Sequence, residues 1–277
     1  MPSILGLAAA LLLWVWLLLP GRGARARMRP FAGGRYAHRG LHGPAGPPEN
    51  SIPAFRGAAE RGYGIELDVH LTADGELVVF HDDDTARVCG AGGRIREMTL
   101  PELQNLRLAG TGEGIPTFSQ ALEAAGDAPL IIEVKYQREY PALCLRLLEE
   151  LEGRRAPWCV ESFHPLVVRW FRKNRPEACR GILSMDFFRE GKNRGNPAFW
   201  AAKHLLANVL CRPHFVAYGC RDRRRCAGFR LWRMLGGPAV AWTVRSPGEE
   251  AALARDYDAM IFEGYEPEAR RQGTPDI

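Results

Sequence analysis

The chain has 277 residues, of which 46% are hydrophobic and 25% are charged. This composition excludes a disordered chain and is typical of a globular protein with a substantial core. The formal net charge of +5 is modest, and much of the basic excess lies in two local runs, so the charge does not indicate a nucleic-acid partner.

Residues 1–20 carry no charged side chain, and residues 4–19 form an almost unbroken apolar run. The uncharged stretch is long enough to span a bilayer. Four arginines follow it: Arg22, Arg25, Arg27 and Arg29. By the positive-inside rule these arginines hold the downstream domain in the cytoplasm. We therefore expect a transmembrane helix over residues 1–21, a basic linker over residues 22–34, and a membrane-anchored, single-pass protein whose downstream domain is cytoplasmic.

The number and spacing of the cysteines indicate whether the domain lies in a reducing or an oxidising compartment. The seven cysteines include no CxxC pair and no spacing typical of zinc, and their odd number does not suit a disulfide framework. A reducing compartment is therefore favoured. The alternative is a secretory signal peptide cleaved near Ala24 or Ala26, which would place the domain outside the cytosol.

Strands and helices alternate in the rest of the chain. Strands are expected near residues 35, 65, 130, 159, 180, 215, 239 and 259. The first helix after these arginines is capped by Asn50 or Ser51, and others are expected over residues 117–125, 140–151, 165–174, 224–235 and 247–255. Such alternation indicates parallel strands with crossover helices, and eight units favour an α/β fold of the closed (β/α)8 TIM barrel type over an open sheet. We place the barrel at residues 35–272.

The segment after the second strand interrupts this alternation. A turn at Ala73-Asp74-Gly75 leads into a short strand over residues 77–80, which delivers His81 and Asp82 at its end. Residues 83–116 are then irregular, with one short helix capped by Thr99. We interpret residues 83–116 as a small insertion in the barrel.

Three acidic residues lie in or at the ends of apolar strands. Glu66 and Asp68 are two residues apart, so both project from the same face of the second strand. Glu133 ends an apolar run, where an unpaired carboxylate would be costly. Carboxylates at neighbouring strand ends predict a hard-cation site, because such cations prefer oxygen ligands. The alternatives are that Glu66 and Asp68 line the solvated face of a hairpin, and that Lys135 pairs with Glu133.

Six short motifs, in this order, resemble the glycerophosphodiester phosphodiesterase family. They are His38-Arg39-Gly40, Pro48-Glu49-Asn50-Ser51, Glu66-Leu67-Asp68-Val69, His81-Asp82, Glu133-Val134-Lys135 and Trp242-Thr243-Val244. Each motif alone is weak, whereas the ordered set is specific and spreads over residues 35–267. The chain departs from the family at two places. Arg245 stands where the family often has asparagine, and the last strand reads YDAMIFEGYEP in place of a Thr-Asp-x-Pro ending.

The resemblance implies a TIM barrel that hydrolyses glycerophosphodiesters to glycerol 3-phosphate and an alcohol. It also implies one divalent metal ion, Mg²⁺ or Ca²⁺, on the residues that match Glu66, Asp68 and Glu133. The sequence does not indicate which metal is bound, which headgroup is preferred or which oligomer forms.

The resemblance further implies that histidines matching His38 and His81 are the general acid and base, in an order that stays open. His81 is alternatively a metal ligand. Arg39, Lys135 and Trp242 match substrate-binding positions. This set suits the chemistry: hydrolysis of a phosphodiester needs charge neutralised at the phosphate, a proton removed from the nucleophile and a proton given to the leaving alkoxide. A metal on carboxylates meets the first need, and two histidines meet the others.

Two other functions remain open. The first is a lysophospholipase D or a related phosphodiesterase that acts on membrane lysophospholipids, with the arginine-rich segment at residues 221–233 against anionic lipid. The second is a noncatalytic, membrane-anchored binding protein. That function would require the loss of a metal ligand or a histidine, and none is lost.

Overall fold

The structure is a computed structural model that describes residues 4–189, 191, 193 and 195–268. The strands in this part of the chain are β1 Arg35–His38, β2 Gly64–Leu71, β3 Leu77–Val79, β4 Leu130–Val134, β5 Trp158–Ser162, β6 Cys179–Ser184, β7 Phe215–Gly219, β8 Ala239–Val244 and β9 Ala259–Phe262. The α-helices are α1 Ile4–Leu18, α2 Ala24–Met28, α3 Ile52–Glu60, α4 Ala86–Cys89, α5 Leu100–Gln104, α6 Phe118–Ala125, α7 Tyr140–Glu150, α8 Pro165–Asn174, α9 Pro197–Lys203, α10 Asn208–Cys211, α11 Ala227–Met234 and α12 Pro247–Leu253. Short 3₁₀ helices are η1 Arg29–Phe31, η2 Ile95–Glu97, η3 Leu108–Gly110 and η4 Arg223–Arg225.

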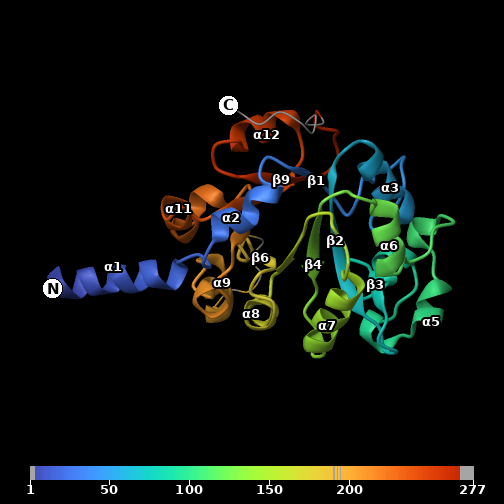
Figure 1. The fold of residues 1–277 in the computed structure, drawn as a ribbon, viewed down its shortest axis with the longest axis horizontal. Coiled ribbons are helices and arrows are strands. Elements are labelled where there is room, and N and C mark those ends of the chain that lie inside the picture. Colours follow the sequence, from blue (N-terminus) through green and yellow to red (C-terminus); the bar gives the residue numbers. More distant parts are fainter. Residues whose placement is uncertain (1–3, 190, 192, 194, 269–277) are drawn as a thin grey trace.

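Eight of these strands form a closed parallel barrel (Figure 1). β1 pairs in parallel with β2 on one side and with β9 on the other, and β4 to β8 complete the ring between them. β3 pairs antiparallel with β2 and lies outside the ring. The prediction of a TIM barrel with eight strands is therefore confirmed, and the short strand near residue 77 forms as expected.

The inside of the barrel is apolar at the end where the strands begin. The buried side chains there include Tyr36, Ile131, Phe215, Val240 and Ile261. Two glycines make room for the largest rings. A Cβ on Gly64 would collide with the ring of Tyr36, and a Cβ on Gly181 would collide with the ring of Phe215. Glycine at these two positions is therefore a packing requirement of the barrel interior.

The segment before β1 closes this end of the barrel. The expected basic linker at residues 22–34 contains α2 and η1, and its Met28 and Phe31 are buried in the same apolar cluster as Tyr36. Arg25 and Arg27 alternate along α2 with Ala24, Ala26 and Met28. The segment therefore contributes to the core as well as carrying positive charge.

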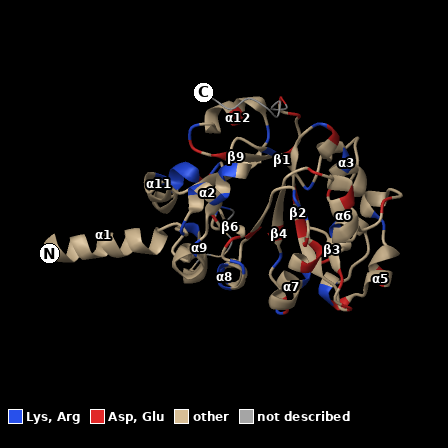
Figure 2. Cartoon of the chain, viewed as in Figure 1, with Lys and Arg blue, Asp and Glu red and all other residues tan. Residues whose placement is uncertain are grey.

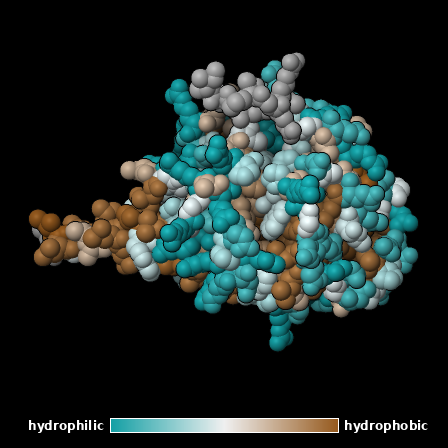
Figure 3. All heavy atoms as spheres, in the orientation of Figure 1, coloured by the Kyte–Doolittle hydropathy of each residue, from teal (hydrophilic) through white to brown (hydrophobic). Residues whose placement is uncertain are grey.

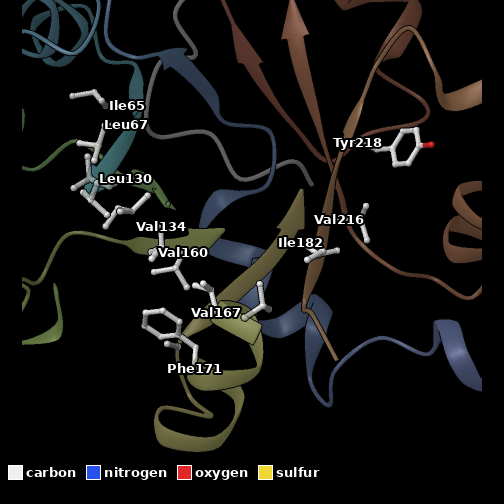
Figure 4. Close-up of a cluster of buried hydrophobic side chains, with 14 of the residues drawn as sticks. Ile65, Leu67, Leu130, Val134, Val160, Val167, Phe171, Ile182, Val216 and Tyr218 are labelled. Carbon is white, nitrogen blue, oxygen red and sulfur yellow. The ribbon is translucent and has the colours of Figure 1, made fainter. Parts of the chain in front are cut away.

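The strand side chains that point out of the barrel pack against the surrounding helices. Figure 4 shows this layer, with Ile65, Leu67, Leu130, Val134 and Val160 from the strands and Val167 and Phe171 from α8. Strands that are buried on both faces read as nearly continuous apolar runs, which is the pattern of β4. All seven cysteines are free, and six of them are buried.

Residues 83–116, the expected insertion, fold against β3. This segment and β3 share a separate apolar cluster whose buried members are Val78, Phe80, Val88, Ile95, Leu103, Leu108 and Ile115. The backbone N–H of Thr99 donates to Glu102 Oε2 at 2.7 Å, which is half of a capping box at the start of α5. Because Phe80 is anchored in this cluster, the backbone that carries His81 is held in place.

α1 projects from the barrel and is apolar on its exposed sides (Figures 1 and 3). It spans 15 residues. At about 1.5 Å per residue its length is about 22 Å, which is short of the hydrocarbon core of a bilayer at about 30 Å. It ends at Leu18 because Pro20 disfavours a helical conformation in the residue before it. The Nη1 of Arg212 then donates to the Trp16 carbonyl at 2.6 Å.

Within the described residues, no helix is long and apolar enough to cross a membrane. The prediction of an N-terminal transmembrane helix is therefore wrong, and so is the prediction of a membrane-anchored, single-pass protein with a cytoplasmic catalytic domain. The predicted span rested on the uncharged stretch through Pro20, whereas the helix ends at Leu18. Residues 1–3 of the predicted span and residues 269–272 of the predicted barrel lie outside the described residues.

Candidate active site

The polar side chains of the barrel interior lie where the strands end. Successive side chains alternate between the two faces of a strand, so a residue two positions after an inward one also faces inward. In β4, Ile131 belongs to the apolar interior and Glu133 follows it on the same face. In β1, His38 follows the inward Tyr36 in the same way. Acidic residues on and beside β2 are visible in red in Figure 2.

Glu66, Asp68 and Glu133 offer carboxylate oxygens that all lie within 4.8 Å of one another. The register of β2 and β4 brings them together, because it sets Asp68 beside Glu133. Burial, together with repulsion from the neighbouring acids, raises the pKa of Glu66 well above its usual value. Burial also raises the pKa of Glu133 to about 7. The three predicted metal ligands therefore meet at one point, and this group does not include His81.

Glu161 is a fourth acid beside this group, in register with Glu133. It is buried, and its Oε2 has no hydrogen-bond partner among the described residues. Burial raises the pKa of Glu161 well above its usual value, and the charges of Glu133 and Asp68 add to this effect. A buried carboxylate is costly unless it is paired or near a metal ion. The set of oxygen donors therefore fits a hard divalent cation such as Mg²⁺ or Ca²⁺.

Two cationic side chains neutralise part of this negative charge. The Nζ of Lys135 lies 2.6 Å from Asp68 Oδ1 and 2.7 Å from Glu133 Oε1. Arg39 Nε lies 3.7 Å from Asp68 Oδ2, and the Arg39 backbone N–H donates to Glu66 Oε2 at 3.0 Å. Burial acts to raise the pKa of Asp68, but Lys135 and the other nearby cations hold it below its usual value. The pairing of Lys135 with Glu133 thus occurs, and Lys135 is shared with Asp68.

The loop after β1 supplies a further contact to this group. Ser51 caps α3 by accepting a hydrogen bond from the Ala54 backbone N–H. Asn50 instead donates from Nδ2 to Asp68 Oδ2 at 2.9 Å. Asn50 and Arg39 both have positive φ, at 54° and 56°. This left-handed conformation is uncommon in Arg and points to a local backbone constraint at the site.

His38 is held between two carboxylates. Its Nδ1 lies 2.7 Å from Glu263 Oε2, and its Nε2 lies 4.0 Å from Glu66 Oε2. Glu263 directly follows β9, two residues after the inward-facing Ile261. The hydrogen bond to His38 lowers the pKa of Glu263 to about 2. Since Glu263 is then ionised, it accepts from His38 Nδ1 and leaves Nε2 free to accept a proton.

His81 also has a carboxylate partner at Nδ1. Its Nδ1 lies 2.5 Å from Asp82 Oδ1, and Arg87 Nε lies 2.5 Å from Asp82 Oδ2. Arg87 Nη2 also contacts Glu49 Oε1 at 2.7 Å, and Glu49 in turn pairs with Arg39 at 2.9 Å. A chain of alternating charges therefore links Asp82 to Arg39. Burial lowers the pKa of both His38 and His81, which favours their neutral forms.

Trp242 lies on β8 and belongs to a group of aromatic side chains at the barrel mouth, which is the end of the barrel where the strands end. Its ring meets that of Phe163 edge-on, with ring centroids 5.5 Å apart. Phe163 is also 6.2 Å from Phe187, and Phe187 is 5.3 Å from Phe199. Such an aromatic surface offers apolar contact area and, toward a cation, favourable interaction with the ring faces.

Several residues of the site have roles that the motifs did not predict. Glu49, Asn50 and Asp82 stand within the quoted motifs, but the contacts that they make depend on the folded loops. Glu263 stands in the segment that departs from the family pattern. The alternation of inward positions along the last strand, from Ile261 to Glu263, is the signal that points to it.

Comparisons with known proteins show which family this chain resembles in sequence. Residues 38–184 match the model of the glycerophosphoryl diester phosphodiesterase family. The chain is 34% identical over 149 residues to a glycerophosphodiester phosphodiesterase of Caldanaerobacter subterraneus, covering 49% of this chain and 61% of that protein. It is 36% identical over 267 residues to human glycerophosphodiester phosphodiesterase 1, covering 83% of this chain and 79% of that protein. The first of these matches therefore spans less than two thirds of the relative's length.

Solved structures share the fold. A phosphodiesterase of Oleispira antarctica, in complex with the product sn-glycerol-3-phosphate, has a TM-score of 0.68 at 23% identity, covering 83% of this chain and 93% of that one. A glycerophosphodiester phosphodiesterase of Thermotoga maritima has a TM-score of 0.62 at 25% identity, covering 82% and 93%. The family model, the human relative and the arrangement of the six motifs around one barrel mouth agree, and the chain belongs to the glycerophosphoryl diester phosphodiesterase family.

Proposed function

We propose that this protein hydrolyses glycerophosphodiesters to glycerol 3-phosphate and an alcohol, using a divalent metal ion and two histidines. The observation that carries the proposal is the group formed by Glu66, Asp68 and Glu133, whose oxygens converge within 4.8 Å. It lies beside His38, at the end of the barrel where the active sites of this fold occur. The named activity of the relatives and the product held by the Oleispira antarctica structure support the same reaction.

Glu66, Asp68 and Glu133 would hold the metal ion, Mg²⁺ or Ca²⁺. When bound, such an ion neutralises charge on the phosphate oxygens. The protein's own cations add to that effect. Lys135 Nζ lies between Asp68 and Glu133, and Arg39 lies beside Asp68. Both are therefore placed to orient a phosphodiester through charge-assisted hydrogen bonds.

His38 and His81 would transfer the two protons of the reaction. Glu263 and Asp82 accept from their Nδ1 atoms, which orients each ring and favours the tautomer with a free Nε2. One histidine removes a proton from the nucleophile, and the protonated form of the other donates to the leaving alkoxide. The two carboxylates also stabilise the protonated imidazoles that form during this exchange.

A second candidate is the hydrolysis of lysophospholipids, and one observation favours it. The aromatic side chains of Trp242, Phe163, Phe187 and Phe199 form a continuous series at the barrel mouth. An acyl chain, or a choline headgroup through cation–π contacts, would gain from such a surface more than a free glycerol group would.

A substrate panel tests both candidates. Purified protein is treated with EDTA, and activity on glycerophosphocholine and on lysophosphatidylcholine is measured before and after Mg²⁺ or Ca²⁺ is restored. We expect turnover of glycerophosphocholine that depends on the added metal. Turnover of lysophosphatidylcholine alone would favour the second candidate, and equal activity with and without metal would contradict the metal site.

A further inference from the structure

A second group of potential metal ligands lies beside His38, outside the acidic group. His38, His42 and Glu263 each offer one donor atom, and these atoms all lie within 4.8 Å of one another. His38 is the last residue of β1, His42 lies in the loop that follows β1, and Glu263 directly follows β9. All three residues are half-buried.

His42 has no other evident role in this arrangement. Its Nε2 is inaccessible to solvent and has no hydrogen-bond partner among the described residues. The loop that carries it is fixed by backbone hydrogen bonds from Leu41 to the Ala54 carbonyl at 2.9 Å and from His42 to the Gly40 carbonyl at 3.1 Å. The imidazole is therefore held near His38 and Glu263 without satisfying its own ring nitrogen, and an unsatisfied buried polar atom is unfavourable.

The donor set differs from that of the acidic group. Two imidazole nitrogens and one carboxylate suit Zn²⁺, whereas Glu66, Asp68 and Glu133 offer only oxygens and suit Mg²⁺ or Ca²⁺. A metal about 2.1 Å from each donor keeps the donors at most about 4.2 Å apart. Because the donor atoms lie within 4.8 Å of one another, small side-chain rotations are enough to reach that spacing.

We propose that His38, His42 and Glu263 form an inhibitory Zn²⁺ site, an inference that rests on the proposed function for its effect on turnover. Zn²⁺ would bind His38 at Nδ1, the atom that now lies 2.7 Å from Glu263 Oε2. The neutral ring keeps one proton, which then resides on Nε2. His38 can no longer accept a proton at Nε2, and Glu263 is a metal ligand instead of a partner for the ring. Turnover would stop while the acidic group stays intact.

The test compares wild type with His42→Gln, because His42 takes no part in the proposed reaction. Zinc binding is measured on the EDTA-treated 277-residue chain by competition with a chromophoric chelator, in excess Mg²⁺ to occupy the acidic group. Activity on glycerophosphocholine is measured over a range of zinc concentrations. His204→Gln is the matched control, since His204 is also half-buried but contacts the Trp200 ring and belongs to neither group of potential metal ligands among the described residues. His42→Ala serves as a second variant if His42→Gln lowers the thermal stability.

We expect wild type and His204→Gln to bind one Zn²⁺ in excess Mg²⁺ and to be inhibited by it. His42→Gln should keep its activity without zinc, and its half-inhibitory zinc concentration should rise by a factor of about 10 to 100 or more, as for weakened metal sites. Equal zinc binding and inhibition in wild type and both His42 variants would overturn the proposal. Zinc binding that depends on His42 in a protein inactive on every phosphodiester would uphold the site and contradict the proposed function.

Discussion

Replacing Glu263 with glutamine removes the charge that holds His38 and leaves a side chain of nearly the same size. Glu263 Oε2 lies 2.7 Å from His38 Nδ1, and this hydrogen bond lowers the pKa of Glu263 to about 2. A hydrogen bond to a charged group contributes about 1.5–3 kcal/mol. The Glu263 side chain is 25% exposed, so we take the lower half of that range. Because about 1.4 kcal/mol in activation free energy corresponds to a tenfold change in rate, kcat should fall by a factor of about 10 to 50.

The assay measures kcat and KM for glycerophosphocholine in Glu263→Gln and Glu263→Asp. A positioning residue for His38 should act on kcat and leave KM nearly unchanged, because the ring must be correctly oriented only for proton transfer. Glu263→Asp keeps the charge and should recover part of the loss. Glu266→Gln is the matched control, since Glu266 lies on the same segment and pairs with the exposed Arg61 at 3.0 Å.

Two results would refute this reasoning. If Glu263→Gln keeps wild-type kcat, the contact to His38 has no part in proton transfer. If Glu263→Gln and Glu266→Gln lower kcat equally, the effect comes from the loop as a whole and not from the hydrogen bond.

Three further predictions follow from the same structure. His81→Ala should lower turnover by a factor of about 10² to 10⁴ with the fold retained, as judged by circular dichroism. Near-normal turnover would show that His81 is not the general acid or base. Gly181→Ala should lower stability by about 1–3 kcal/mol or more in urea unfolding, because its Cβ would meet the Phe215 ring, and an unchanged midpoint would contradict that packing. Burial lowers the pKa of His214 to about 3 in the folded protein, so His214 takes up a proton in the unfolded chain at a higher pH than in the folded one. The free energy of unfolding should therefore decrease as the pH falls from about 6.5 toward 3, by up to about 1.4 kcal/mol per pH unit. His214→Gln should flatten this pH dependence, and an unchanged slope would exclude His214 as its source.

The alternation of side chains made the barrel and its acidic group predictable. Glu66 and Asp68 are two residues apart on a strand, so their common face followed from the period of a strand alone. The eight alternating units indicated a closed barrel with carboxylates at its strand ends. The register that sets Asp68 beside Glu133 was not predicted, because it depends on how β2 and β4 pair in the fold.

Loop contacts and helix ends were less predictable, because they depend on tertiary structure. The sequence left Asn50 and Ser51 as equal candidates for a helix cap, and the fold uses Ser51 as the cap and Asn50 as a donor to Asp68. Composition indicated a membrane span, but α1 ends at Leu18 and is too short for one. A count of uncharged residues measures hydropathy and does not locate the end of a helix.

The most direct test of the central claim is the identity of the products. Glycerophosphocholine is incubated with the EDTA-treated protein, with and without restored Mg²⁺ or Ca²⁺, and the reaction is followed by ³¹P NMR. Our account predicts that the substrate signal is replaced by glycerol 3-phosphate, with release of choline, only when the metal is present. It also predicts that Glu66→Gln abolishes this conversion, because Glu66 is one of the three converging carboxylates. Formation of phosphocholine and glycerol, or full conversion by Glu66→Gln in EDTA, would contradict it.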